Sequence, residues 1–432
     1  MVTSITTWMS LINSFLSCFT EPGSMIFMEL TIAWILCTTR HTVSGMLPYV
    51  SPESRRAHDA YHRFFPDGAW VMADLWQRLA RLLVARLRPG GTLLLALDDT
   101  LFHHSGRHID GAGWWRDAVR STTKKVVHGW GLNLVVLTLQ VPSPWGGEPL
   151  ALPLNLRLHR KKGATHPDLA REMLREVVSW FPERRFHCVA DGFYACLAGD
   201  PVEEVTLISR MRRDATLYDL PPQTQTGRRG RPRQKGLPLA KPPKLAEQAD
   251  RKKAWQTVTV RERSQKRRRQ LYSQEVVWYK VSKTPVRLVI SRDPDGVQED
   301  DFFVTNDLKM KPAQVIETFA DRWPIEDTFK YVKQYLGGQH PQTYKAPGPE
   351  RAAALSFWLY SMTWLWFLSQ KPSQQAMKWT PWYPQKVCPS FADALSSLRE
   401  HLWRERIKAW FGLDAVHDHN FEFLIQNLAA VA

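Results

Sequence analysis

The chain has 432 residues, 44% of them hydrophobic, which is enough to bury the cores of about two to four domains. Its 58 Lys and Arg residues exceed its 42 Asp and Glu residues, so the net charge is +16. Nineteen basic and five acidic residues lie between Arg210 and Arg269, and this segment alone carries +14. Such a block favours a polyanion partner, most often nucleic acid, and its alternative is a solvated loop without a partner.

The five cysteines form no CxxC pair, which argues against a disulfide framework or a structural zinc site and indicates a reducing interior. No Lys or Arg precedes Arg40, so we expect no secretory signal peptide. Residues 352–370 carry no charge and approach the length of a membrane span. Their Ser, Thr and Trp content favours a buried core helix instead. We therefore expect a cytoplasmic protein without a membrane partner.

The first part of the chain is predicted to be helical and then to change to strands. Apolar residues recur at helical spacing in 8–20, 25–38 and 69–86, which predicts a helical domain over residues 1–88. An Arg-Pro-Gly-rich break follows. Residues 89–210 then predict an α/β core, with a helix over 167–180 and apolar strands over 92–97, 130–142, 150–160, 186–190 and 204–210.

Residues 211–310 interrupt this order with a basic linker and a predicted β-strand insertion. The Pro-, Gly- and Arg-rich part, 221–244, is expected to be poorly ordered without a partner. Alternating side chains predict strands that begin near Trp255, Gln274, Val286 and Asp301. The core is expected to resume over 311–345 with a helix bearing Glu326, and residues 346–432 are predicted to be mostly helical.

Three acidic residues stand out by their position. Asp99 and Asp191 each follow an apolar strand, and the carboxyl ends of neighbouring strands meet at one edge of an open sheet. Glu326, on a helix packed across that edge, would complete an oxygen-rich site that suits two Mg²⁺ ions, with Mn²⁺ as a substitute. Asp98 is the alternative to Asp99, because strand alternation allows only one of them to face the site. Aspartates after strands also serve simply as turn formers or helix caps.

The segment 319–333 has the mixture of side chains that a metal-bound phosphodiester requires. At about 100° per helical residue, Phe319, Arg322, Glu326 and Lys333 fall within roughly 60° of one another. Pro324 either kinks this helix or starts it, with Arg322 on the preceding turn. An amphipathic surface helix with scattered charges is the alternative interpretation.

These residues resemble the DDE transposases of bacterial insertion sequences, in particular the branch whose RNase H-like core is interrupted by β-strands before the Glu. The branch signature Y-x2-R-x3-E-x6-K is matched by Phe319, Arg322, Glu326 and Lys333, with Phe in place of Tyr. Residues 97–100 are similar to its first-Asp motif and residues 189–192 to its second. The resemblance implies an α/β fold with an RNase H-like mixed sheet, a β-rich insertion and helical ends.

The resemblance also implies a metal-dependent enzyme that cleaves insertion-sequence ends and joins the 3′-OH to target double-stranded DNA, acting as a homodimer on DNA in the bacterial nucleoid. Asp99, Asp191 and Glu326 would be the catalytic metal ligands, and Arg322 and Lys333 would bind phosphates. Residues 227–233 resemble a minor-groove hook. The basic block adds the expected DNA-binding residues Arg228, Arg229, Arg231, Arg233, Arg267, Arg268 and Arg269.

Two other functions fit the same residues. One is a metal-dependent nuclease that does not join strands, and the other is an inactive DNA-binding derivative, which the Tyr-to-Phe change at position 319 keeps open. Related enzymes stack a flipped base on an aromatic residue of the insertion. Trp278 is a candidate for that role, although a Trp in the core or in an edge strand is the preferred interpretation.

Overall fold

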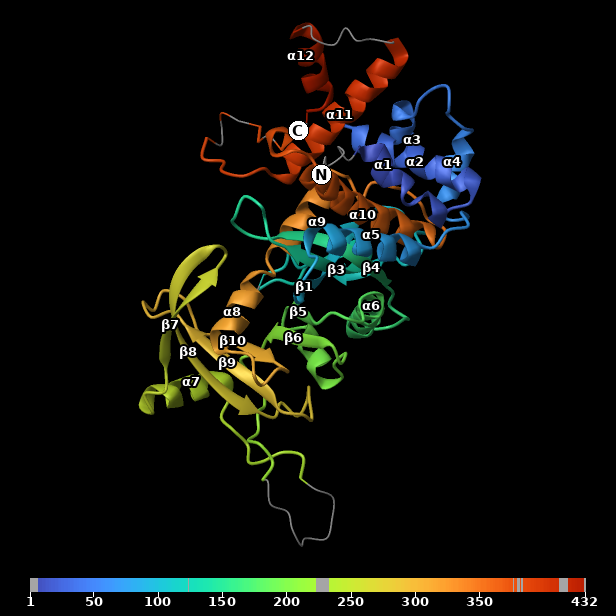
Figure 1. Ribbon diagram of the computed structural model, residues 1–432. Helices are drawn as coiled ribbons and strands as arrows, with labels where there is room; N and C mark the ends of the chain where they lie inside the picture. Colours follow the sequence, from blue (N-terminus) through green and yellow to red (C-terminus); the bar gives the residue numbers. More distant parts are fainter. Residues whose placement is uncertain are drawn as a thin grey trace.

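A mixed sheet with helices on both faces forms the centre of the molecule (Figure 1). The computed structural model describes residues 7–122, 124–222, 233–375, 377–378, 381, 384–411 and 419–430. Within these residues the sheet has ten strands in the order β2-β3-β1-β5-β6-β10-β9-β8-β7, and β4 also pairs with β3.

The core of the sheet is antiparallel on one side and parallel on the other. Strands β1 (Leu93–His103), β3 (His128–Val141) and β4 (Leu150–His159) form antiparallel pairs, and the short β2 (Gly113–Arg116) pairs with the start of β3. Strands β5 (Phe186–Ala190) and β6 (Val205–Arg210) run parallel to β1. Apolar runs without alternation form these strands because both faces are covered. The predicted RNase H-like mixed sheet with helical ends is confirmed.

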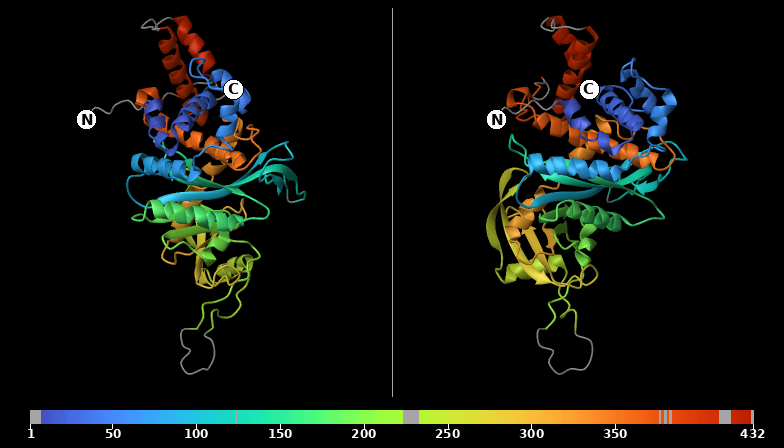
Figure 2. Two further views of the ribbon diagram at one scale, coloured as in Figure 1. Left: turned by 90° about the vertical axis from the view of Figure 1, so that its right-hand side faces the viewer. Right: turned by 45° about the vertical axis from the view of Figure 1, so that its right-hand side comes forward.

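Different helices cover the two faces of this core. Helices α5 (Met72–Leu87), α9 (Pro324–Gln334) and α10 (Gly348–Leu368) lie on one face, and α6 (His166–Trp180) with the 3-10 helix η3 (Tyr194–Gly199) lies on the other (Figure 2). Helix α10 is buried along nearly its whole length, so the predicted core helix over 352–370 is confirmed. No helix among the described residues is long and apolar enough to cross a membrane.

The two ends of the chain form a further layer over α10 (Figures 1 and 2). The amino-terminal part comprises α1 (Trp8–Asn13), η1 (Leu16–Cys18), α2 (Glu21–Leu36), α3 (Val43–Met46), η2 (Leu47–Tyr49) and α4 (His58–Phe64). The carboxyl-terminal part comprises η4 (Pro372–Gln374), α11 (Phe391–Phe411) and α12 (His419–Leu428). The rings of Phe15 and Phe27 meet Trp358 of α10 at 4.9 and 5.4 Å, so this layer shares the core.

The inserted strands continue the core sheet and do not form a separate one (Figure 1). After α7 (Pro242–Arg251) come β7 (Gln256–Glu262), β8 (Gln265–Val276), β9 (Val286–Arg292) and β10 (Asp301–Thr305), and β10 pairs antiparallel with β6. Helix α8 (Pro312–Ala320) packs across these strands. The strand predicted to begin near Gln274 begins earlier, because the basic residues before it form the exposed part of a hairpin.

Candidate active site

Asp98 and Asp99 lie within β1 and not after it. The prediction that the strand ends at residue 97 is wrong, because β3 pairs with β1 as far as His103. Successive side chains of a strand point to opposite faces. The two carboxylates therefore have different neighbours, and these distinguish their roles.

The Asp98 side chain points toward Arg322 and Glu326, which lie just before and within α9. Arg322 Nη1 donates to Asp98 Oδ2 at 2.5 Å, and Arg322 Nη2 donates to Glu326 Oε1 at 2.9 Å. One guanidinium thus joins two carboxylates that are far apart in the sequence. Arg322 is buried, and its Nε has no hydrogen-bond partner. Burial raises the pKa of Asp98 to about 7, against the attraction of Arg322 and with added repulsion from Asp99 and Asp191.

Asp191 lies beside Asp98 at the edge of the parallel pair. The last paired residues are Leu97 of β1 and Ala190 of β5, so Asp98 and Asp191 come next on neighbouring strands. Asp191 Oδ1 accepts a hydrogen bond from the Phe193 backbone N–H at 3.0 Å, and its carbonyl oxygen accepts one from Ser209 Oγ at 2.7 Å. Both bonds fix the turn that follows β5.

Asp99 lies on the face covered by α6 and η3. Its Oδ1 accepts a hydrogen bond from Tyr194 OH and its Oδ2 one from Asn133 Nδ2, both at 3.3 Å. The Asn133 side-chain oxygen accepts in turn from His166 Nε2 at 2.8 Å. Burial and the neighbouring carboxylates raise the pKa of Tyr194, so the phenol stays protonated and donates. Asp99 therefore belongs to a partly buried polar network on the face of β1 opposite to Arg322 and Glu326.

The signature residues between Phe319 and Lys333 span two helices. Helix α8 ends at Ala320 and α9 begins at Pro324, so Arg322 lies on the turn between them, as the second interpretation of Pro324 expects. The Phe319 ring is buried, and its centroid lies 4.9 Å from that of the Phe303 ring. On α9, Lys333 Nζ lies 6.0 Å from the centroid of the Phe102 ring, and burial lowers the pKa of Lys333 to about 8.

The carboxylates fit divalent cations by their chemistry, since their oxygens are hard ligands and their mutual repulsion contributes to the raised pKa of Asp98. Among the residues that the structure describes, no three His, Cys, Asp or Glu side chains are gathered closely enough to hold one ion. The Arg322 guanidinium contacts both Asp98 and Glu326. A positive charge thus already lies between two of the proposed ligands.

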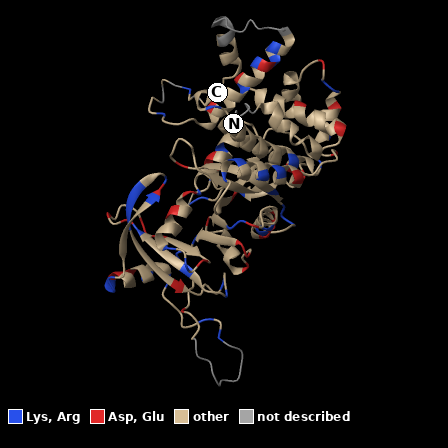
Figure 3. Cartoon of the chain, in the orientation of Figure 1, with Lys and Arg blue, Asp and Glu red and all other residues tan. Residues whose placement is uncertain are grey.

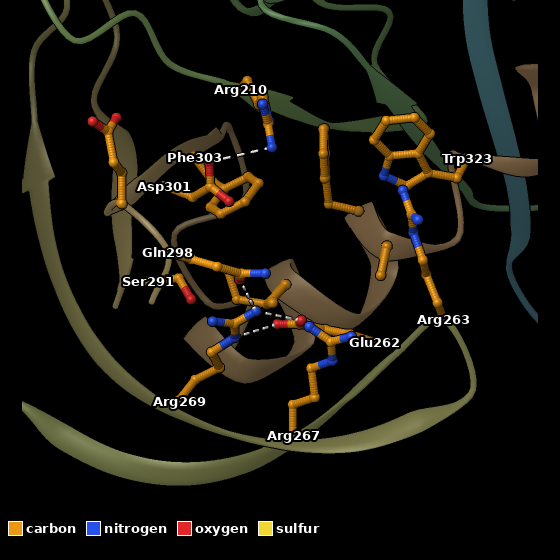
Figure 4. A pocket seen from close by; sticks show the side chains of 14 residues that line it. Arg210, Glu262, Arg263, Arg267, Arg269, Ser291, Gln298, Asp301, Phe303 and Trp323 are labelled. Carbon is orange, nitrogen blue, oxygen red and sulfur yellow. Dashed lines mark hydrogen bonds and ion pairs between the residues drawn. The ribbon is translucent and has the colours of Figure 1, made fainter. Parts of the chain in front are cut away.

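Beside this site, the β7–β8 hairpin and α8 enclose a cavity of about 280 Å³ (Figure 4). Its lining combines arginines with aromatic rings: Arg210, Arg263, Arg267, Arg269, Phe303, Phe319 and Trp323. The Arg263 guanidinium lies 4.0 Å from the centroid of the Trp323 ring. Trp323 is partly exposed, whereas Trp278 lies beyond the end of β8 and is buried, as the preferred interpretation of Trp278 expects.

The basic residues of β8 divide into two kinds. Arg267 and Arg268 are exposed on the hairpin, where Lys and Arg gather (Figure 3). Arg269 is buried and donates to both oxygens of Glu262 at 2.8 and 2.7 Å, so it is held inside the protein. Arg233 is exposed, whereas Arg228, Arg229 and Arg231 lie outside the described residues.

Sequence reasoning missed the Asp99 network and the pair of Arg263 with Trp323. A weak signal for the first is Asn133, a polar amide in the mostly apolar strand β3. Tyr194 and His166 gave no signal, because they reach the network only through the packing of η3 and α6 on the sheet.

Residues 15–267 match the family described as DDE superfamily endonuclease, which is more than half of the chain. No functionally curated protein matches the sequence. The matched residues include Asp98, Asp99 and Asp191 and end before Glu326, whose link to the site is the contact through Arg322.

Proposed function

The chain belongs to the DDE superfamily endonucleases, and we propose that it is a transposase that cleaves the ends of an insertion sequence and joins the freed 3′-OH to target DNA. The family indicates a nuclease-type enzyme that acts on DNA with divalent metal ions. The observation that supports the proposal best is the Asp98–Arg322–Glu326 contact, which brings the first acidic motif to the signature helix across 224 residues of sequence.

The metal ligands proposed here are Asp98, Asp191 and Glu326. Asp98 replaces the expected Asp99 because Asp98 faces Arg322 and Glu326, whereas Asp99 contacts Tyr194 and Asn133. When bound, two Mg²⁺ or Mn²⁺ ions supply the positive charge that activates a water or a 3′-hydroxyl and stabilises the leaving oxygen. Arg322 and Lys333 each have a cationic group to donate to a phosphate oxygen near the scissile bond.

The DNA is proposed to extend from this site over the β7–β8 hairpin. Arg267 and Arg268 are exposed there, and such residues contribute contacts to the phosphate backbone irrespective of sequence. Helices of residues 1–88 would recognise the ends of the element, and two copies of the chain would act together on a pair of ends. The other proposed parts of the chain are the core, over residues 89–210 and 311–345, the insertion, over 211–310, and the helical carboxyl-terminal region, over 346–432.

The test is a reaction with purified protein, a labelled DNA fragment that carries the repeats flanking the gene, a supercoiled plasmid and Mg²⁺. A transposase gives cleaved ends and a joined product on the plasmid. EDTA and the variant Glu326→Gln should abolish both, because each removes the metal or one of its ligands. Cleavage without joining would instead identify a nuclease, and DNA binding without cleavage an inactive derivative.

A further inference from the structure

Two histidines on α4 lie together, away from the proposed active site. His58 and His62 are separated by one helical turn, so their side chains share a face of the helix. Their Nε2 atoms are 3.2 Å apart, and their ring centroids are 4.4 Å apart. Ser44, on α3, places its Oγ 3.1 Å from His58 Nε2 and 3.4 Å from His62 Nε2. Three polar atoms from two helices thus converge.

The separation of the two nitrogens matches the spacing of two ligands on one metal ion. Imidazole nitrogens bind Zn²⁺ at about 2.0–2.1 Å, so at a tetrahedral angle they lie about 3.3 Å apart and at a right angle about 2.9 Å. The observed 3.2 Å falls between these values. Two histidines one turn apart on a helix are a recurrent way to bind such an ion.

The chemical state of the pair also suits a metal. Coordination to a metal requires neutral imidazole, and the hydrogen bond between the rings requires that at least the accepting ring be neutral. The three residues are exposed at the surface, so an ion can reach them. The structure shows no third His, Cys, Asp or Glu gathered with them among the described residues, which leaves the remaining positions to Ser44 or water.

We propose that His58 and His62, with Ser44 beside them, bind a borderline transition-metal ion such as Zn²⁺ or Ni²⁺ and thereby link α4 to α3. Imidazole selects such ions, whereas the carboxylates at Asp98, Asp191 and Glu326 suit Mg²⁺ and Mn²⁺. The two sites therefore differ in the ions they take, and this one does not depend on whether the protein joins DNA strands.

Isothermal titration of the full chain with Ni²⁺ tests the site, with Mg²⁺ present in large excess to occupy the carboxylates. The wild type should bind one ion at the pair. His58→Ala or His62→Ala should each weaken this binding by about 100-fold, because the second donor acts at a high effective concentration. The exposed His108→Ala serves as the matched control and should leave the affinity unchanged.

A thermal unfolding series in the presence of Ni²⁺ gives a second readout. The ion should raise the melting temperature of the wild type and of His108→Ala, and it should not raise that of His58→Ala or His62→Ala. Circular dichroism of the metal-free variants shows whether each is folded. Absence of saturable Ni²⁺ binding in the wild type would overturn the proposal, as would an affinity equal to that of the wild type in folded His58→Ala and His62→Ala.

Discussion

At the scale of single residues, adjacent carboxylates have different environments. Asp98 and Asp99 are neighbours in β1, yet one contacts the cationic Arg322 and the other accepts hydrogen bonds from the neutral donors Tyr194 and Asn133. Pleating of the strand causes this difference, since it directs the two side chains to opposite faces. The proposal that Asp98, and not Asp99, is a metal ligand therefore depends on the face of β1 to which each side chain points.

Asn substitutions at the two positions should separate these roles. Asp98→Asn should reduce DNA cleavage at saturating Mg²⁺ by at least about 1,000-fold, because it removes a proposed ligand. Asp99→Asn should reduce cleavage by about tenfold or less and lower the melting temperature, because it disturbs the buried network. Gel-based cleavage rates and thermal unfolding of both variants check this. The reverse order of cleavage rates would assign the ligand to Asp99.

Lys333 should make DNA binding sensitive to pH in the alkaline range. Burial lowers its pKa to about 8 from an ordinary value of 10.5, and a bound phosphate favours the charged form. Above pH 8 binding must therefore take up a proton, and the affinity should fall by up to about tenfold per pH unit. Below pH 8 this residue is already charged and adds no dependence.

Fluorescence anisotropy with labelled DNA between pH 7 and 9.5 measures this dependence. Lys333→Arg is the matched variant, since Arg stays protonated throughout the range. Its affinity should stay nearly constant with pH. A wild-type profile as flat as that of Lys333→Arg would show that Lys333 makes no phosphate contact.

At the scale of elements, the β7–β8 hairpin combines a structural arginine with exposed ones. Arg269 forms a two-bond ion pair with Glu262 inside the hairpin, whereas Arg267 and Arg268 are exposed. The side chain of Glu262 is only 15% exposed, so the loss of its partner would leave a nearly buried carboxylate unpaired. One run of three arginines thus contains one residue held inside the protein and two that face the solvent.

The double variant Arg267→Ala/Arg268→Ala should leave stability nearly unchanged and weaken DNA binding. It should also reduce the slope of log affinity against log salt concentration by about two, because two phosphate contacts are lost. Arg269→Ala should instead lower the free energy of unfolding by about 3 kcal/mol. Salt titrations by anisotropy and urea unfolding distinguish the outcomes, and a reduced salt slope in folded Arg269→Ala would contradict this division.

At the scale of the whole molecule, the two ends of the chain are joined in one helical layer. Arg399 of α11 donates to the carbonyl oxygens of Ile35 and Cys37 at the end of α2, at 2.7 and 2.9 Å, and to that of Ala430 at 3.0 Å. These are carbonyls that helix ends leave without an internal partner. One buried guanidinium therefore joins the end of α2 to α11 and to the residues after α12, in addition to the packing of α2 against α11.

Arg399→Ala should loosen both ends together. It leaves buried carbonyl oxygens without donors, so the free energy of unfolding should fall by about 3 kcal/mol. Hydrogen exchange should rise in α2 and α12 in parallel, while β1 and β5 remain protected. An increase confined to α12 would show that the two ends are not coupled through this residue.

Local sequence patterns alone predicted several secondary-structure elements, the fold class and the family of this protein. The sequence predicted the strand 186–190 with the bounds that the structure has, and it predicted the start of β10 at Asp301. It also predicted the buried helix α10 and the break at Pro324, because apolar runs and proline act within a few residues. Fold class and family also followed from short motifs, each of which lies within a few residues of the chain. These features depend on each segment's own chemistry.

Tertiary structure decided the rest. Only packing shows that β10 pairs with β6 and merges the insertion into the core sheet, that Asp98 faces Glu326, and that Arg269 is held by Glu262. The physical reason is common to all three. Periodicity shows that a strand or helix has two faces, but the partner that covers each face comes from residues far away in the sequence, and only the folded chain brings them together.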